Sequence, residues 1–196
     1  MSETPAHTEL PAENTSVLPA EPASGNEDVI EGETHALEWH APVLVRIDEH
    51  TTIPHLLAKR VQRAPRRPLI ARKLEMGSTW QNMTAAEFYE DVQTTAAGLI
   101  GLGLNHGDAI AIMSRTRYEW TLLDFAAWTA GLLPVPIYET SSGEQIEYII
   151  KDADVRAIVT ETVTQRELAL DACHRLSKDD ITVLSLDAEA MQTIRD

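Results

Sequence analysis

The segment from Met113 to Ser142 constrains the fold more than any other part of the sequence. Its centre, Tyr118–Leu132, is apolar on nearly every side, which is typical of a buried helix. The apolar run Pro134–Tyr138 follows and ends in the polar residues Glu139–Ser142. A short apolar run bounded by turn residues is typical of a strand that is covered on both faces. The segment therefore predicts a strand, a buried helix and a buried strand in succession.

The same alternation extends on both sides of this segment. Apolar runs predict further strands over 109–114, 156–160 and 181–186, and amphipathic runs predict helices over 142–152 and 164–176. Strands that alternate with helices form parallel sheets with right-handed crossovers. The expected fold class is therefore α/β, a mostly parallel sheet with helices on both faces. Asp187 is a candidate cap for one more helix.

The region before the alternation predicts two helices and a hairpin. Thr52 and Pro54 open a helix that Pro65 closes, and two strand-like runs, 68–74 and 78–83, flank Gly77. The sequence Thr84-Ala-Ala-Glu87 is a capping box that starts the second helix, and Ser142-Gly-Glu-Gln145 is another that starts a later one. The residues expected to face the core are Leu56, Leu57, Ala58 and Val61 in the first helix and Phe88, Val92, Thr95, Ala96, Leu99, Leu102 and Gly103 in the second.

The acidic charge is concentrated at the N-terminus. The net charge is −15, and residues 1–40 hold nine acids without a Lys or Arg, which leaves −6 for the rest. This composition predicts a disordered acidic tail over 1–40 and a folded domain over 41–196. The acidic domain argues against a nucleic-acid surface, because such a surface must neutralise phosphates. The basic cluster from Lys59 to Arg67 lies where it complements a helix dipole.

Several classes of protein are excluded or disfavoured by what the sequence contains. The N-terminus has no signal peptide pattern, and Gly131 and two prolines interrupt the apolar stretch Trp120–Tyr138, so it is not a membrane span. Cys173 is the only cysteine, which fits a reducing cytoplasm and predicts a buried structural thiol rather than a nucleophile. His7, His35 and His40 lack metal-ligand spacing.

Glycines at 101, 103 and 107 suggest a dinucleotide loop, but they follow a helix and precede a strand, the reverse of the required order. They are expected to end the helix and turn the chain, which disfavours a nicotinamide-dependent oxidoreductase.

Two loops follow the carboxyl ends of predicted parallel strands, where such sheets bind ligands: 115–119 and 139–142. Hydroxyls there either hold an anion or cap the next helix, and capping is the favoured interpretation.

Several segments together resemble the N-terminal region of AMP-forming long-chain fatty acyl-CoA synthetases, and most closely the actinobacterial type. The resemblance covers about residues 42–190. It rests on Trp80, Thr84–Phe88, Ala97–Ile100, Gly103-Leu104, Gly107-Asp108, Ile112–Trp120, Asp124–Ala126, Trp128, Ala130-Gly131 and Pro134–Ser142.

The resemblance implies an enzyme that joins a fatty acid to ATP, with a magnesium ion at the phosphates, and then transfers the acyl group to CoA. It places Tyr138, Glu139 and Thr140 near the CoA tunnel and Arg166 near a CoA phosphate. The family's phosphate loop, its adenine motif and its catalytic Lys are absent from this sequence. We therefore expect no catalytic residue, metal ligand or adenylation activity from this chain alone, and an exposed apolar surface where the rest of the enzyme would pack.

A non-catalytic α/β module that binds nucleotide or acyl-CoA is the alternative. Peripheral contact with a membrane stays open in either case.

Overall fold

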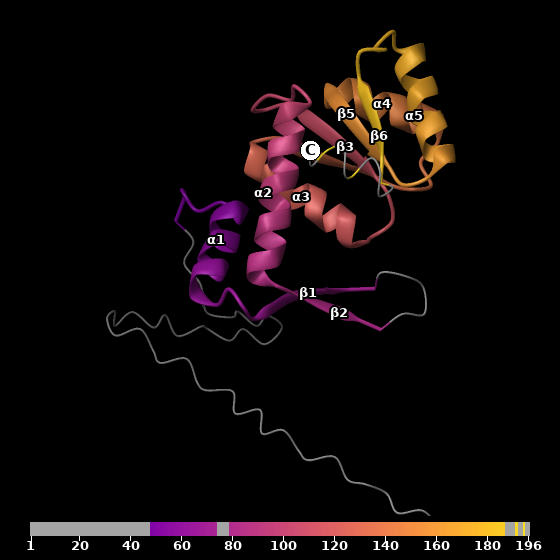
Figure 1. Ribbon diagram of the computed structural model, residues 1–196. Coiled ribbons are helices and arrows are strands. Elements are labelled where there is room, and N and C mark those ends of the chain that lie inside the picture. The colour runs from indigo at the N-terminus through magenta and orange to yellow at the C-terminus, as the bar shows by residue number, and fades with distance from the viewer. Residues whose placement is uncertain (1–47, 74–78, 187–190, 192–193, 195–196) are drawn as a thin grey trace, which may run out of the picture. The chain divides into compact units, whose positions relative to one another are not determined.

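The computed structural model describes residues 48–73, 79–186, 191 and 194, and its centre is a sheet of four parallel strands (Figure 1). The strands are β3 (Ala109–Met113), β4 (Leu133–Ile137), β5 (Val155–Thr160) and β6 (Thr182–Ser185), in the spatial order β4-β3-β5-β6. The predicted parallel sheet is confirmed. The acidic tail, the turn at Gly77 and the candidate cap Asp187 lie outside the described residues.

Helices cover both faces of this sheet, as the alternation predicted. Figure 1 shows α2 (Ala85–Gly101) and α3 (Tyr118–Ala130) on one side of the strands and α4 (Gly143–Asp152) and α5 (Val163–Arg175) on the other. Side chains of β3 alternate between the two apolar clusters: Ile110 and Ile112 pack with α2 and α3, while its other residues pack with α4 and α5. The central strand is therefore buried along its whole length.

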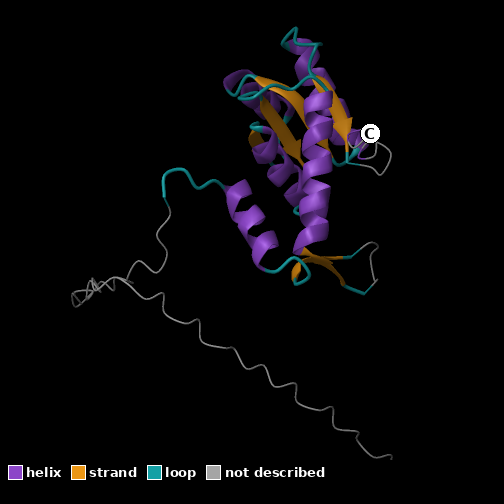
Figure 2. Ribbon diagram, turned by 60° about the vertical axis from the view of Figure 1, so that its left-hand side comes forward, coloured by secondary structure: helices purple, strands orange, loops and turns teal. Residues whose placement is uncertain are grey.

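One helix and a two-stranded hairpin come before α2 and the parallel sheet in the sequence. Helix α1 (Ile53–Arg63) packs on α2 and α3, and β1 (Pro68–Arg72) pairs antiparallel with β2 (Gln81–Thr84) to form the predicted hairpin, which Figure 2 shows at one end of α2. The sequence predicted four core-facing residues in α1, but only Leu57 is buried and Leu56 is 48% exposed. A short helix that lies along one groove buries a single narrow line of side chains. Leu102 and Gly103, expected on the inner face of α2, lie after its end and are likewise exposed.

Capping boxes start four of the five helices from α1 to α5. Both predicted boxes are present, because the side chains of Thr84 and Ser142 accept hydrogen bonds from the N–H groups of Glu87 and Gln145. Thr52 and Thr162 start α1 and α5 in the same way, with His55 and Gln165 at the third helical position. Ser142 therefore acts as a cap, in agreement with the favoured interpretation.

Strand β4 corrects the prediction of a fully buried strand. It lies at an edge of the four-stranded sheet, and Leu133 is 58% exposed. The N–H of Leu133 donates to the carbonyl of Asp108 on the β3 side, so the alternate residues Pro134 and Pro136 direct their nitrogens away from β3. Proline has no N–H, and an outward-facing edge position is where a strand tolerates it.

Two expectations about single segments are confirmed. Cys173 is buried among apolar side chains, and burial raises the pKa of its thiol, so it is an inert core residue. Gly103 and Gly107 have φ near +90°, so the glycine segment turns the chain, as expected. In the described residues, no helix combines the length and apolar character that crossing a membrane requires.

Gly131 is a position where a side chain should destabilise the fold. Its φ is +76°, and an added Cβ would lie 2.5 Å from Cδ2 of His106. We expect Gly131→Ala to lower the free energy of unfolding by about 1–2 kcal/mol, measured by urea denaturation. Gly101→Ala is the control, because its Cβ would meet nothing within 4 Å. Equal effects of the two substitutions would contradict this account.

Asp124 is a carboxyl group buried in α3, where it is 8% exposed. Burial raises its pKa to about 6. The folded state therefore favours the protonated form, and its contribution to stability is present below pH 4 and lost as the pH rises through about 6. We expect Asp124→Asn to stabilise the protein at pH 7.5 by roughly 1–2 kcal/mol, less than the shift alone would give because solvent screens the group.

At pH 4 the same substitution should have almost no effect. Thermal unfolding at both pH values, with the exposed Asp180→Asn as control, tests this. A stabilisation that is equal at the two pH values would show that burial of the charge is not the cause.

Candidate functional site

The carboxyl ends of β3, β4 and β5 carry three loops that meet at one edge of the sheet. Because β3 lies between β4 and β5, the loop of Ser114–Arg117 is flanked by the loop that follows Ile137 and by Glu161 and Thr162 after β5. The N–H of Glu161 donates to the carbonyl of Met113, which fixes the ends of the two central strands together. This edge is where open parallel sheets bind ligands.

Glu161 is the centre of a charged network at this edge. Its carboxylate accepts hydrogen bonds from the backbone N–H of Arg115 at 2.9 Å and from Nη2 of the same residue at 2.8 Å, and Nη1 of Arg117 donates to it at 3.3 Å. Its side chain is only 5% exposed. The network thus ties two loops that are 46 residues apart in the sequence.

The network alternates positive and negative groups. Arg117 also donates to Glu119 at 2.6 Å, and Nε of Arg115 lies 4.0 Å from the Glu139 carboxylate. Hydrogen bonding to Arg115 holds the pKa of Glu161 below its usual range, so the carboxylate is ionised at neutral pH. The arrangement holds the loop after β3 in one conformation and presents two guanidinium groups at the sheet edge.

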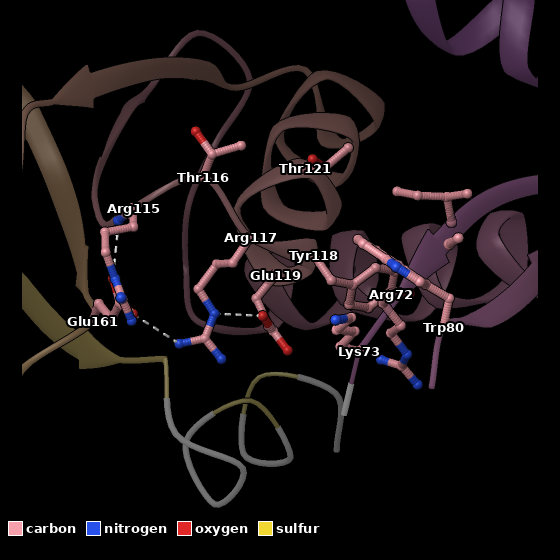
Figure 3. Close-up of a pocket in the computed structure, with 12 residues that line it drawn as sticks. Arg72, Lys73, Trp80, Arg115, Thr116, Arg117, Tyr118, Glu119, Thr121 and Glu161 are labelled. Carbon is pink, nitrogen blue, oxygen red and sulfur yellow. Dashed lines mark hydrogen bonds and ion pairs between the residues drawn. The ribbon is translucent and has the colours of Figure 1, made fainter. Parts of the chain in front are cut away.

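The network forms one wall of a pocket of about 630 Å³ (Figure 3). The opposite wall comes from the hairpin: Arg72 lies 4.4 Å from the centre of the Tyr118 ring, and Lys73 lies 5.3 Å from the centre of the Trp80 ring. Figure 3 shows Arg115 and Glu161 on one side and Arg72, Lys73 and Trp80 on the other. The pocket therefore combines cations, aromatic rings and the hydroxyls of Thr116 and Thr121.

A second pocket, of about 440 Å³, contains two of the residues predicted from the sequence. Tyr138 and Glu139 line it together with Ser114, Thr116 and Trp120, among others. Tyr138 is 85% exposed and also borders a hollow beside Tyr148 on α4. The second pocket is lined by apolar side chains, such as Ile137 and Trp120, and by the hydroxyl-bearing residues Ser114 and Thr116.

The other two predicted residues lie near this edge but outside both pockets. Thr140 is exposed in the loop after β4, and Arg166 is exposed in the first turn of α5, directly after the loop that holds Glu161. The roles of all four residues stay predictions. In the ranges that the structure describes, no group of three His, Cys, Asp or Glu side chains is arranged to hold a metal ion.

Two pairs of neighbouring acids, Asp152 with Asp154 and Asp179 with Asp180, are exposed. Asp154 precedes β5, at the end of the sheet opposite to the charged network, and accepts hydrogen bonds from Lys178 and Arg156. These pairs hold the pKa of its carboxyl below the usual range. They have no connection to the charged network.

Sequence reasoning missed Glu161 and the hairpin cations. The loop of Arg115 and Arg117 was identified, but its carboxylate partner follows a different strand. Only the adjacency of β3 and β5 brings Glu161 to this loop, and strand order is not visible in the spacing of apolar residues. The signal that could have found Glu161 is its position immediately after a buried strand.

Comparison with known proteins gives a family match over most of the chain. Residues 57–195 match the family described as AMP-binding enzyme. The long-chain-fatty-acid–CoA ligase FadD15 of Mycobacterium bovis is 34% identical over 125 residues, which is 64% of this chain and 20% of that ligase. The chain thus spans about a fifth of the length of that relative.

Two further similarities bear on size and fold. An uncharacterised protein of Mycobacterium tuberculosis, Rv1549, is 31% identical over 124 residues, which is 62% of this chain and 71% of that protein. The crystal structure of VinN superposes with a TM-score of 0.63 at 21% identity, over 74% of this chain and 35% of VinN. The structural likeness concerns the fold alone.

Proposed function

The chain belongs to the family of AMP-binding enzymes, and on that premise we propose that it is the N-terminal part of a long-chain fatty acid–CoA ligase. The proposed reaction joins a fatty acid to ATP, releases pyrophosphate and then transfers the acyl group from AMP to CoA, with a magnesium ion at the phosphates. The observation that carries the proposal is the continuous match over residues 57–195, together with the similarity to FadD15.

Within such an enzyme, we assign the second pocket to the CoA side of the reaction. Tyr138 and Glu139 line it, Thr140 follows them, and the hydroxyls of Ser114 and Thr116 face the same space. Hydroxyl groups beside apolar side chains suit the amide-bearing arm of CoA. The exposed guanidinium of Arg166 suits a phosphate of the same molecule. CoA, when bound, supplies the thiol that displaces AMP.

Adenylation requires groups that the described residues do not supply. The attack of a carboxylate on ATP needs the pyrophosphate charge to be neutralised and the reactants to be aligned. The sequence has no Ser/Thr/Gly-rich loop followed by Lys, and the chain corresponds to only a fifth of FadD15. We therefore propose that the chain is inactive alone and contributes the sheet edge, the charged network and the CoA contacts.

A chimera tests the proposal. The segment of FadD15 that matches this chain is exchanged for the corresponding residues of this chain, and pyrophosphate release is measured with ATP and palmitate. We expect the chimera to release pyrophosphate and to form acyl-CoA, and the 196-residue chain to do neither. A folded chimera without activity would refute the ligase assignment, and acyl-CoA formation by the chain alone would refute its inactivity.

Arg166→Ala in the chimera tests the CoA contact separately. Loss of one charge-assisted contact should raise the KM for CoA about fivefold. Pyrophosphate release without CoA should not change. Arg156→Ala is the control, because Arg156 is an exposed arginine at the opposite edge of the sheet. A KM that is the same in both variants would remove Arg166 from the site.

The short relative Rv1549 favours a second candidate function. The match covers 71% of that protein, so a chain of comparable size exists outside the long ligases. The second candidate is a non-catalytic module that binds nucleotide or acyl-CoA at the same sheet edge. Cooperative unfolding of the isolated chain, together with its stabilisation by acyl-CoA or nucleotide, would favour this module over a part that needs completion.

A further inference from the structure

The pocket between the hairpin and the loop after β3 holds more positive than negative charge. Four cationic side chains line it (Arg72, Lys73, Arg115 and Arg117) against two carboxylates (Glu119 and Glu161). Asp91 accepts a hydrogen bond from the Tyr118 hydroxyl at 2.6 Å and is not among the lining residues. The pocket thus has a formal charge of +2 in a chain whose net charge is −15.

The carboxylates lie with the arginines of one wall only. Glu161 pairs with Arg115 and Arg117, and Glu119 pairs with Arg117. On the hairpin wall, no ion pair or hydrogen bond joins the side chain of Arg72 or Lys73 to another described residue. Each of these two cations lies over an aromatic ring instead, so the excess charge belongs to the hairpin.

Arg72 shows the strongest sign of an incomplete site. Its Nε is shielded from solvent and has no hydrogen-bond partner among the described residues. A buried N–H without an acceptor destabilises a folded protein by about 1–3 kcal/mol, so an acceptor that enters the pocket would gain from satisfying it. The Tyr118 ring holds the guanidinium in place beside the pocket, which lowers the entropy lost when a ligand binds.

We propose that this pocket is a phosphate-binding site, in which Arg72 and Lys73 hold the phosphate group of a nucleotide. A phosphate monoester carries about −2 charge at neutral pH, which matches the +2 of the lining residues. The fork of the guanidinium suits phosphate oxygens, and the ammonium of Lys73 adds a mobile point charge. A volume of about 630 Å³ accommodates more than the phosphate alone.

Two substrates of the proposed ligase carry such groups: ATP, with its chain of phosphates, and CoA, with its 3′-phosphorylated ADP. The choice between them rests on the proposed function, whereas the site itself does not. The pocket adjoins the CoA pocket assigned above, since Arg115 and Thr116 line both, but Tyr138, Glu139, Thr140 and Arg166 are not among its lining residues.

Calorimetric titration of the 196-residue chain with three probes tests the site: inorganic pyrophosphate, ATP and 3′,5′-ADP. The variants are Arg72→Met and Lys73→Met, which keep the length of the side chain and remove its charge. Lys151→Met is the matched control, because Lys151 is exposed on α4 and lines none of these pockets. Circular dichroism verifies that each variant is folded, and Lys73 is exposed, so its substitution should leave the fold intact.

We expect each pocket variant to weaken the binding of at least one probe roughly tenfold, and the control to leave it unchanged. Selective binding of ATP and pyrophosphate would identify ATP as the source of the phosphate, and selective binding of 3′,5′-ADP would identify CoA. The proposal is overturned if no probe binds at millimolar concentrations, or if the pocket variants bind as the control does. Either failure leaves the activity of the chimera untouched, so the two proposals fail independently.

Discussion

Replacing Glu161 with alanine is expected to lower the free energy of unfolding by about 3 kcal/mol, because two arginines lose a carboxylate that is almost completely shielded from solvent. Arg115 is exposed and can be hydrated again, which limits the loss, whereas Arg117 is only partly exposed. The loop after β3 should also lose the hydrogen bond that its Arg115 N–H donates. Urea denaturation measures the first effect, and amide hydrogen exchange at the loop measures the second.

The pH dependence of this effect has a definite sign. The pKa of Glu161 lies below the ordinary value of 4.5, so its stabilisation is present above that value and is lost as the pH falls through the lower pKa of the folded state. The difference between wild type and Glu161→Ala should therefore shrink in acid. Glu161→Gln keeps the acceptor oxygen and should have less than half the effect. An alanine variant as stable as wild type at pH 7 would show that the network is incidental to the fold.

The second large effect is expected at Phe88, which is fully buried in α2. Its ring contacts Tyr118 and Phe125 edge to face, with ring centres 6.1 Å and 5.4 Å apart. Phe88→Ala should lower the free energy of unfolding by about 4 kcal/mol, because it removes a large apolar side chain and leaves a cavity. Phe88→Leu, which fills most of the space, should lower it by only about 1–2 kcal/mol.

Phe88→Leu should also weaken phosphate binding in the pocket that Arg72 and Lys73 line. Tyr118 contacts both Phe88 and Arg72, so loss of the Phe88 ring frees the aromatic ring that holds the guanidinium. Near-ultraviolet circular dichroism should show reduced aromatic signal in Phe88→Leu, and pyrophosphate binding should weaken although no pocket residue has changed. Unchanged binding in a folded Phe88→Leu variant would show that the position of Tyr118 does not depend on this contact.

The sequence was most informative where one local interaction decides the structure. The capping boxes at Thr84 and Ser142 and the inner face of α2 from Phe88 to Leu99 were predicted correctly, because each depends on residues within a few positions of one another. The parallel sheet followed from the alternation of strands and helices. Periodicity could not show that β4 lies at the edge, although Pro134 and Pro136 held that information, since neither can donate within a central strand.

The candidate site was less accessible to prediction. Arg115 pairs with a residue 46 positions away, and Arg72 reaches Tyr118 through the register of a hairpin and the position of α3. Such contacts depend on strand order and on packing between elements, for which the spacing of apolar residues carries no information. The resemblance to acyl-CoA synthetases indicated the loop after β4 and Arg166, but not the charged network or the pocket beside it.

The prolines of β4 disfavour the addition of a further strand at the outer edge of β4. The outer edge of β4 presents the carbonyl groups of Pro134 and Pro136 without an N–H between them, so an incoming strand would find acceptors and no donors. Strand addition at that edge, and the edge-to-edge aggregation that follows from it, are disfavoured by the missing N–H groups of proline rather than by charge. A strand that extends the described sheet with a complete ladder of hydrogen bonds is therefore expected beyond β6 rather than beyond β4.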